Sequence, residues 1–425
     1  MERASQQNGE AGAGLAPDNP PAVSKGLPLH GTRVLDFSRL LPGPWCTQFL
    51  SDLGATVIKV EMPGTGDMSR ANPPAYKTMS VYFNSVNGGK RSIAIDLTRP
   101  GGNDIIERLI KGSDVIVESF RPGVAKKLGV DYEAAKSLNG RIIYCAISGF
   151  GQTGPLSHIS GHDLVIQAMS GFVALGAEPG VRPQVPGFQA ADYAGGAIAL
   201  VGILSGLMKC KATGEGSYLD VAMFDSLFAM CNITQTAAMA RKAGQSGEPA
   251  LEVWGGNPRY ATYLTKDGRS VAVALLEARL WANFCNVIGR PDLVDADEDP
   301  SARHTDHGEK SDQYKAAIAD YCLSMPRDDL IAEMERNGVP ICAVYSPDET
   351  LASENVAARK LIHVVDDPAE GPMPQIVNPL AGSGLVREQR TSAPNIGFSN
   401  DEILHELGFE TSDIESFRTQ GVIAP

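Results

Sequence analysis

The sequence lacks paired cysteines, a standard phosphate-binding loop and a long apolar segment. Its seven cysteines are widely spaced, and none belongs to a Cys-x-x-Cys motif. Cys145, for example, lies within the apolar run 142–147, where cysteine serves as a small core residue. This pattern argues against a disulfide framework and against a zinc site, so we predict no metal. It is typical of the reducing cytoplasm, where we expect the protein to reside.

No apolar run approaches the ~18 residues that a membrane span needs, and we predict no membrane association. The formal net charge of −13 argues against nucleic acid or an anionic lipid surface as a partner. An anionic small molecule is compatible with this charge, because it needs only a local basic pocket. Residues 1–26 are polar and rich in Gly, Pro and Gln, which predicts a disordered lead-in.

Strand and helix patterns alternate in the first half of the chain. A strand over 32–37, a helix over 45–53 and a strand over 56–61 form a βαβ unit, and apolar strands follow at 92–97, 114–118 and 142–148. This alternation predicts an α/β fold with a parallel sheet covered on both faces. The first turn, Leu41-Pro42-Gly43-Pro44, lacks the Gly-x-Gly-x-x-Gly spacing of a dinucleotide site. We interpret its prolines as a break before the helix.

A smaller α+β domain is predicted in the second half. Alternating residues around Asp267-Gly268 indicate a β-hairpin over 260–274, and helical patterns follow it. The predicted division is a large domain whose N-terminal part spans 27–230, a linker and small domain at 231–345, and a C-terminal segment at 346–425 that returns to the large domain.

Two glycine-flanked motifs hold the candidate proton-transfer groups. Gly161-His162-Asp163 and the stretch from Asp192 to Gly195-Gly196 each precede an apolar helix pattern. A side chain at a helix start lies beside free N–H groups and the positive end of the dipole, which favour anions. Gly195 and Gly196 allow a ligand to approach closely. The structural alternative is that Asp192 is an N-cap and His162 an ordinary turn residue.

Basic residues cluster near the predicted strand ends, namely Arg70, Lys90, Arg121, Lys126 and Lys127. In open α/β sheets, ligands bind at the carboxyl ends of the strands. The turn Phe120-Arg121-Pro122-Gly123 follows the strand 114–118 directly, so it is the preferred candidate for a phosphate-bearing ligand. Ordinary solvated surface charge is the alternative.

Five segments resemble, in order, the signatures of the class III CoA-transferase superfamily, which also contains the α-methylacyl-CoA racemases. They are Gly31–Asp36, Asp52–Glu61, Lys90–Ile93, Phe120–Gly123 and Thr213–Gly216. The resemblance implies a Rossmann-like large domain built from both chain ends, a small central domain and an interlocked homodimer. It also implies an acyl-CoA substrate and no further cofactor. The expected substrate contacts are Arg70, Lys90, Phe120, Arg121, Lys126, Lys127, Asp163, Gly195 and Gly196.

Two mechanisms are compatible with this resemblance, and both use the aspartate that matches Asp192. In transferases it is a nucleophile that forms a mixed anhydride and then an aspartyl-CoA thioester. In racemases it moves the α-proton on one face of the thioester, while the histidine matching His162 serves the other face. A glutamate matching Glu277 steadies that histidine.

Gly161-His162-Asp163 and Glu277 resemble the racemase form, whereas 163–171 resembles the transferase continuation. We favour the racemase, which would epimerise a 2-methylacyl-CoA, because His162 and Glu277 have a task in a two-base mechanism. CoA transfer between carboxylic acids is the alternative, and a catalytically silent acyl-CoA-binding protein is a third hypothesis. No motif identifies the acyl group.

Overall fold

The computed structural model describes residues 26–176, 180–245, 256–299, 303–305 and 307–424. The chain forms two compact units. One combines the chain up to Leu40 with Pro44–Ile116 and His363–Pro425, and the other contains Leu41–Gly43 and Val117–Ile362. This division falls at residue 116, whereas the sequence analysis places its domain boundary at residue 230. The predicted disordered lead-in lies, up to residue 25, outside the described residues.

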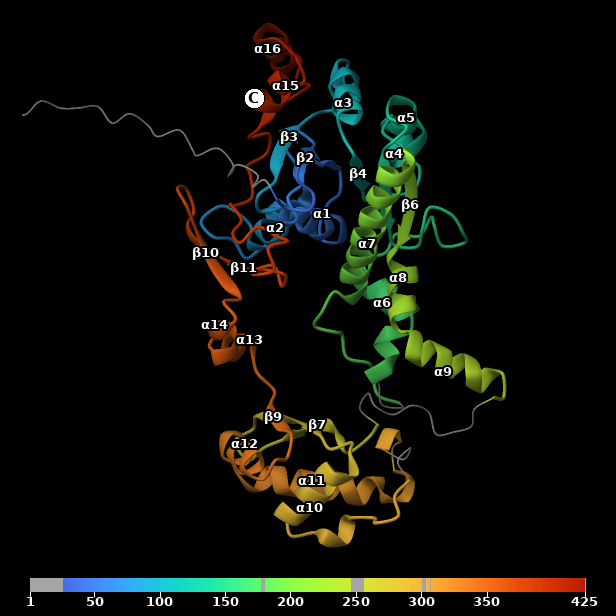
Figure 1. The fold of residues 1–425 in the computed structure, drawn as a ribbon, viewed down its shortest axis with the longest axis vertical. Coiled ribbons are helices and arrows are strands. Elements are labelled where there is room, and N and C mark those ends of the chain that lie inside the picture. Colours follow the sequence, from blue (N-terminus) through green and yellow to red (C-terminus); the bar gives the residue numbers. More distant parts are fainter. Residues whose placement is uncertain (1–25, 177–179, 246–255, 300–302, 306, 425) are drawn as a thin grey trace, which may run out of the picture. The chain divides into compact units, whose positions relative to one another are not determined.

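A six-stranded sheet has the strand order β3-β2-β1-β4-β5-β6. Figure 1 labels β2, β3, β4 and β6 of this sheet. Its strands are β1 (Arg33–Asp36), β2 (Thr56–Glu61), β3 (Arg91–Ala94), β4 (Val115–Glu118), β5 (Ile143–Ser148) and β6 (Ser217–Ala222). The pairs β1–β2, β2–β3 and β5–β6 are parallel. Nearly every residue of β4 and β5 is buried, which explains their apolar sequences. The predicted α/β class is confirmed, and the strand order is that of a Rossmann-type sheet.

Helices connect these strands. They are α1 (Pro42–Asp52), α2 (Val81–Asn87), α3 (Gly102–Lys111), α4 (Val124–Lys127), α5 (Tyr132–Leu138), α6 (Asp163–Met169), α7 (Ala190–Thr213), α8 (Met223–Met230) and α9 (Asn232–Lys242). The predicted break at Pro42-Gly43-Pro44 is wrong, because these residues form the first turn of α1. Proline is tolerated there since a first-turn N–H has no acceptor within the helix.

The C-terminal segment packs within the first unit. Arg390 forms an ion pair with the buried carboxylate of Asp52 in α1, and Asn378 donates to the same carboxylate at 2.7 Å. Asn400 accepts the backbone N–H of Ala94 in β3 at 2.9 Å. This segment contains the hairpin β10 (Ile362–Asp367) and β11 (Gly371–Ile376), followed by α15 (Asn400–Glu406) and α16 (Thr411–Thr419). Polar contacts therefore join distant parts of the sequence.

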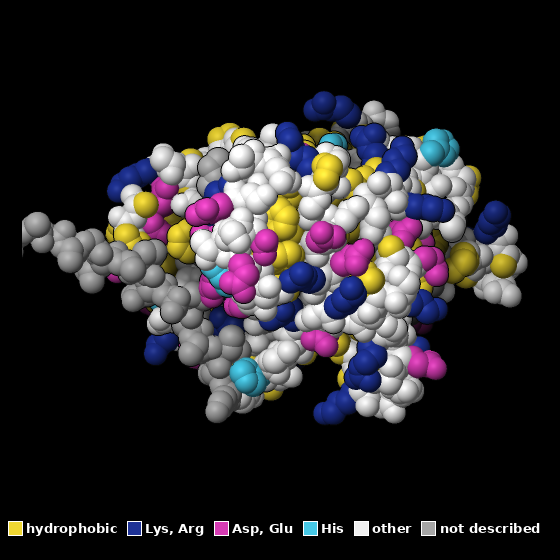
Figure 2. Space-filling model, turned by 90° about the horizontal axis from the view of Figure 1, so that it is seen from above, with side chains coloured by type: hydrophobic (Ala, Val, Ile, Leu, Met, Phe, Trp, Pro, Cys, Tyr) yellow, Lys and Arg dark blue, Asp and Glu magenta, His cyan; other side chains and the backbone are white. Residues whose placement is uncertain are grey.

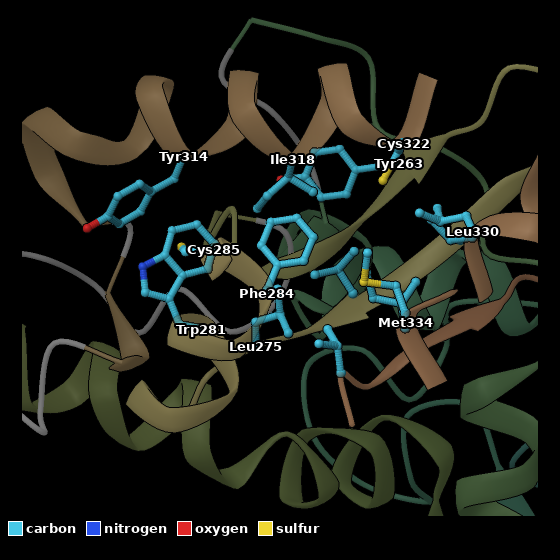
Figure 3. Packing of buried hydrophobic residues seen from close by; sticks show 14 of the residues in the cluster. Tyr263, Leu275, Trp281, Phe284, Cys285, Tyr314, Ile318, Cys322, Leu330 and Met334 are labelled. Carbon is cyan, nitrogen blue, oxygen red and sulfur yellow. The ribbon is translucent and has the colours of Figure 1, made fainter. Parts of the chain in front are cut away.

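A three-stranded antiparallel sheet forms the small domain, with β7 (Tyr260–Leu264), β8 (Ser270–Ala274) and β9 (Ile341–Ala343). The predicted hairpin is present, and Gly268 in its turn has a φ of 75°. The domain also contains α10 (Ala278–Val287), α11 (Ser311–Ser324) and α12 (Arg327–Arg336), and two short helices, α13 (Pro347–Leu351) and α14 (Glu354–Ala358), come after it in the chain. Trp281, Phe284 and Tyr314 belong to its buried core, where the ring of Trp281 packs against the other two (Figure 3).

Helix α7 spans 24 residues. By length and composition alone it could cross a membrane, although core helices of soluble proteins meet the same criterion. The prediction that no segment is apolar enough to meet this criterion is wrong, because the charged residues of α7 lie near its two ends. Gly195 is buried where α7 meets α8, and a Cβ built there would lie 2.7 Å from Cγ of Met223. Glycine at this position therefore serves the close packing of two helices.

We expect Gly195→Ala to lower the free energy of unfolding by about 1–3 kcal/mol, because Met223 must move to admit the methyl group. Gly140→Ala is the matched control, since a Cβ there meets no atom within 4 Å. Urea unfolding followed by circular dichroism measures both variants. Equal stability of the two would show that α7 and α8 do not need the glycine.

Candidate active site

Asp192 stands in the first turn of α7, with its side chain partly buried. Burial raises the pKa of its carboxyl group to about 7, and the neighbouring carboxylate of Asp163 adds to the increase. Near neutral pH the group is therefore divided between its protonated and ionised forms. Such a carboxyl suits a nucleophile or a base that works near neutral pH.

Asp163 acts as the cap that α7 lacks. The N-cap residue of α7, Gln189, makes no side-chain cap bond. Instead, Oδ1 of Asp163 accepts the backbone N–H groups of Ala191 at 2.9 Å and Asp192 at 3.1 Å. A carboxylate is well suited to the positive end of a helix dipole. The structural alternative for Asp192, that it is itself the N-cap, is excluded because Gln189 holds that position.

His162 precedes Asp163 and is the N-cap residue of α6, but its exposed side chain makes no cap bond. The contact of Asp163 with α7 brings the backbone of the His162 motif to the start of the Asp192 helix. The two motifs that the sequence analysis singled out therefore meet in the structure. Beside them, the rings of Phe188 and Tyr193 stack with centroids 4.9 Å apart.

Glu277 lies at the N-cap position of α10 in the small domain, and its side chain is exposed. Within the part of the chain that the structure describes, it forms no hydrogen bond or ion pair with His162. The turn before it is held by buried Arg259, which donates to the carbonyl groups of Leu275 and Leu276 at 2.9 Å each. The position of the turn is thus defined, but the described contacts do not join Glu277 to the other candidates.

The turn Phe120–Gly123 carries accessible positive charge. Arg121, Lys126 and Lys127 are exposed, and the two lysines end the short helix α4. Nη2 of Arg121 donates to Oγ of Ser160 at 3.0 Å, two residues before His162. The face drawn in Figure 2 shows acidic and basic side chains interspersed.

Lys90 and Arg70 lie in a different setting. The ammonium group of Lys90 is fully buried, within 3.0 Å of oxygens of Asp36, Pro44, Thr47 and Asn87. Burial lowers its pKa to about 8. Arg70 pairs with Glu61 through two hydrogen bonds and lies 3.7 Å above the ring of Phe83. Both cations therefore already have partners inside the fold.

Gln167 and Glu118 are two further residues of the site region that the sequence motifs do not reveal. Gln167 is buried and donates to Asp163 four residues earlier on the same helix, so the i, i+4 spacing was the available signal. Glu118 ends the apolar strand β4, and its Oε2 accepts the N–H of Phe120 at 2.6 Å. Burial raises the pKa of Glu118 to about 7. The sequence feature that could have revealed Glu118 is a carboxylate at the end of an apolar strand.

Gly195 and Gly196 are both buried in α7, and Gly195 faces Met223 as described above. Among the described residues, no cluster of three or more His, Cys, Asp or Glu side chains is arranged to hold a metal ion.

A family model for CoA-transferase family III matches residues 29–400. The chain is 32% identical over 393 residues to a succinate–glutarate CoA-transferase from Agrobacterium fabrum, covering 89% of this chain and 96% of that protein. It is 35% identical over 346 residues to an acetyl-CoA:oxalate CoA-transferase from Acetobacter aceti, covering 80% and 87%. The crystal structure of a CAIB/BAIF family protein from Brucella suis has a TM-score of 0.77 at 30% identity, covering 90% and 100%.

The raised pKa of Asp192 predicts a pH-dependent stability difference. Between its ordinary value and about 7 the folded state binds the proton more strongly than the unfolded state, so the stability of the wild type falls as pH rises through this window. Asp192→Asn removes this pH-dependent fall in stability, because the amide does not ionise. We expect its stability advantage over wild type to grow by about 1–3 kcal/mol between about pH 5 and pH 8.

Chemical denaturation across that pH range measures this difference. Asp225→Asn, which replaces an exposed carboxylate on α8, is the control and should run parallel to wild type. If the stability of Asp192→Asn also runs parallel to that of wild type across this pH range, the pKa of Asp192 is not raised in the folded protein.

Proposed function

Because the chain belongs to CoA-transferase family III, we propose that it moves coenzyme A from an acyl-CoA to a second carboxylic acid through a covalent intermediate on Asp192. The observation that carries this proposal is the half-buried carboxyl group of Asp192, held at the start of α7 by Asp163 and with its pKa raised to about 7. The predicted superfamily is confirmed, and the chain is an enzyme of this family.

The proposed reaction has two symmetrical halves. A carboxylate oxygen of Asp192 attacks the thioester carbonyl carbon, the C–S bond breaks, and CoA leaves as the thiolate. The thiolate then attacks the aspartyl carbonyl of the mixed anhydride, which releases the donor acid and leaves an aspartyl-CoA thioester. The acceptor carboxylate reverses these steps, so that the acceptor acid departs as its CoA thioester and Asp192 is regenerated.

The preference for the racemase is not supported. The relatives reported above are CoA-transferases, and the described contacts do not join Glu277 to His162. A transferase needs one carboxylate nucleophile and space for a second acid, and Asp192 meets the first requirement. The names of the relatives support small organic acids as donor and acceptor.

For the nucleotide part of CoA, we propose that its phosphates bind near Phe120, Arg121, Lys126 and Lys127. The three cations of this set, Arg121, Lys126 and Lys127, are exposed, and Arg121 also contacts the loop that leads to His162. Lys90 and Arg70 are less suitable, because their charges are already compensated inside the fold. Contact of acyl-CoA with Asp163, Gly195 and Gly196 stays a prediction, as do the absence of a further cofactor and the cytoplasmic location.

We also propose a homodimer. Exposed apolar side chains on α7 and the neighbouring α6 support it, among them Leu164, Met169, Val201 and Met208. A second copy would cover this surface and keep it from water. Sedimentation equilibrium should give twice the mass of the chain, and a monomer at micromolar concentration would contradict the proposal.

If the protein is a transferase, we expect a covalent adduct on Asp192 and no exchange of the α-proton of the substrate. With an acyl-CoA as donor, hydroxylamine should convert Asp192 to a hydroxamate that peptide mass spectrometry detects, and product formation should require a free carboxylic acid. Asp192→Asn should lose turnover by at least about a thousandfold while it still folds. Exchange of the α-hydrogen of a 2-methylacyl-CoA in deuterium oxide without any acid would instead support the racemase.

The CoA site predicts a separate kinetic effect. Replacing Lys126 and Lys127 together by alanine should raise KM for acyl-CoA about tenfold and change kcat much less, because the lost charges contact phosphates away from the reacting bond. Replacing Lys209 and Lys211, two exposed lysines near the end of α7, is the matched control. A KM unchanged by both double variants would place the nucleotide elsewhere.

A further inference from the structure

Gln167 lies at the centre of the contacts that hold the start of α7. It belongs to α6 and is 1% exposed. Its Nε2 donates one hydrogen bond to Oδ2 of Asp163 and another to the backbone carbonyl of Phe188 at 2.9 Å. An amide nitrogen has two N–H donors, so both are used. Neither acceptor could bind the amide oxygen in place of the nitrogen, which fixes the orientation of this side chain.

We propose that Gln167 is a positioning residue, which holds the carboxylate of Asp163 against α7 and thereby sets the place of the Asp192 nucleophile. This inference rests on the proposed function for the role of Asp192. The contacts form a continuous chain: the amide of Gln167 binds one oxygen of Asp163, and the other oxygen binds the backbone N–H groups of Ala191 and Asp192.

The helical spacing explains why this pair forms. Asp163 is the first residue of α6 and Gln167 the fifth, so their side chains lie on the same face of the helix. Ile166 and Gln167 are the buried residues of α6. A buried amide without acceptors would cost free energy. The Asp163 carboxylate and the Phe188 carbonyl remove that cost for the two N–H donors, whereas Oε1 of Gln167 is buried without a hydrogen-bond partner among the described residues. The donated hydrogen bond in turn locks the rotation of the Asp163 carboxylate.

A second anchor reaches the chain before Asp192. The carbonyl of Phe188 accepts Nε2 of Gln167 and also the backbone N–H of Ala190, both at 2.9 Å. Gln167 therefore holds the residues before α7 directly, and holds the first turn of α7 through Asp163. The stacked rings of Phe188 and Tyr193 belong to the same short stretch. Loss of the amide would release both anchors and admit water to Asp192.

The charged groups around Asp192 determine in which direction its pKa moves when the Gln167 amide is lost. Burial raises the pKa of Asp192, and the charge of Asp163 on α6 adds to the increase; burial likewise raises the pKa of Tyr193 on α7 itself, and the charge of Asp192 adds to it. The elements packed on α7 carry further charged groups, which are exposed: Asp225 on α8, Asp220 on β6 and, before α7, Arg182. A freed Asp163 carboxylate and entry of water act in the same direction, and both move the pKa of Asp192 down from about 7.

The test uses Gln167→Met, which keeps the length of the side chain and removes both donors. Gln48→Met is the matched control, because Gln48 is a buried amide that donates to Asp52 four residues later, on α1. If Gln167→Met does not fold, Gln167→Asn serves in its place, since it keeps the amide but shortens its reach. Thermal melting of all variants checks the fold.

Two measurements distinguish a role of Gln167 in positioning Asp192 from a role in the stability of the fold alone. The first is the pH profile of CoA transfer with the full-length protein. The second is the pH dependence of carbodiimide labelling of Asp192, read by peptide mass spectrometry, which needs no turnover. For folded Gln167→Met we expect kcat to fall about tenfold or more, with both the acid limb and the labelling midpoint about one pH unit lower than in wild type. Gln48→Met should leave both unchanged.

A folded Gln167→Met with the labelling midpoint of wild type overturns the proposal, whether or not kcat falls. A double-mutant cycle adds a check: in an Asp163→Asn background, Gln167→Met should move the midpoint less than it does in wild type, because the part of its effect that acts through Asp163 is already lost and only the anchor on Phe188 remains. Full additivity also overturns it. If the wild type forms no aspartyl adduct, the proposed function fails instead, while the labelling midpoint still reports on the role of Gln167.

Discussion

The hydrogen bonds that the Asp163 carboxylate accepts from the first turn of α7 determine which contacts are left to Asp192. A helix start has free N–H groups, and the side-chain oxygen of an Asp, Asn, Ser or Thr residue commonly accepts one of them. If Asp192 capped its own helix, its oxygens would be occupied by the backbone. Because Asp163 on another helix fills that role, the carboxyl group of Asp192 is left without a side-chain hydrogen bond to any described residue and can meet a substrate.

The magnitudes show which force governs the pKa of Asp192. The positive end of a helix dipole favours an ionised carboxylate by about 0.3–1 kcal/mol, which is less than one pKa unit. Burial and the Asp163 charge act in the opposite direction and raise the pKa from 3.8 to about 7. Burial therefore outweighs the dipole. The helix start mainly fixes the position of the carboxyl group, and its burial away from water raises its pKa.

Several residues of the family-like motifs maintain the fold and do not reach the candidate site. Lys59 forms a buried ion pair with Asp67 and donates to the carbonyl of Ser38, and Lys90 binds Asp36 in the same interior. These two lysines hold the pKa of Asp36 below its usual range in spite of burial. Removal of one partner from such a pair leaves an unpaired buried charge, at a cost of about 3–5 kcal/mol. Motifs of this kind identify a fold reliably and carry little information about the reaction.

That limit explains the preference for the racemase. It depended on His162 and Glu277, two exposed side chains whose roles the surrounding contacts do not define. Gly195 shows the same limit in another form. Glycine beside a candidate aspartate is compatible with close approach of a ligand, but in the fold the neighbouring atoms belong to Met223 of α8.

The alternation of apolar strands and helices was enough to predict the α/β class, the parallel sheet and the small-domain hairpin, because burial on both faces imposes a local pattern on each element. Asp192 was also a candidate from the sequence, through its place at the start of a long apolar helix pattern, and its catalytic role stays a prediction. The partnership of Gln167, Asp163 and the α7 backbone depended on tertiary structure, as did the interior pairing of Lys90. Hydrogen bonds and desolvation act over a few ångströms between residues that are far apart in the chain, and no local pattern records them.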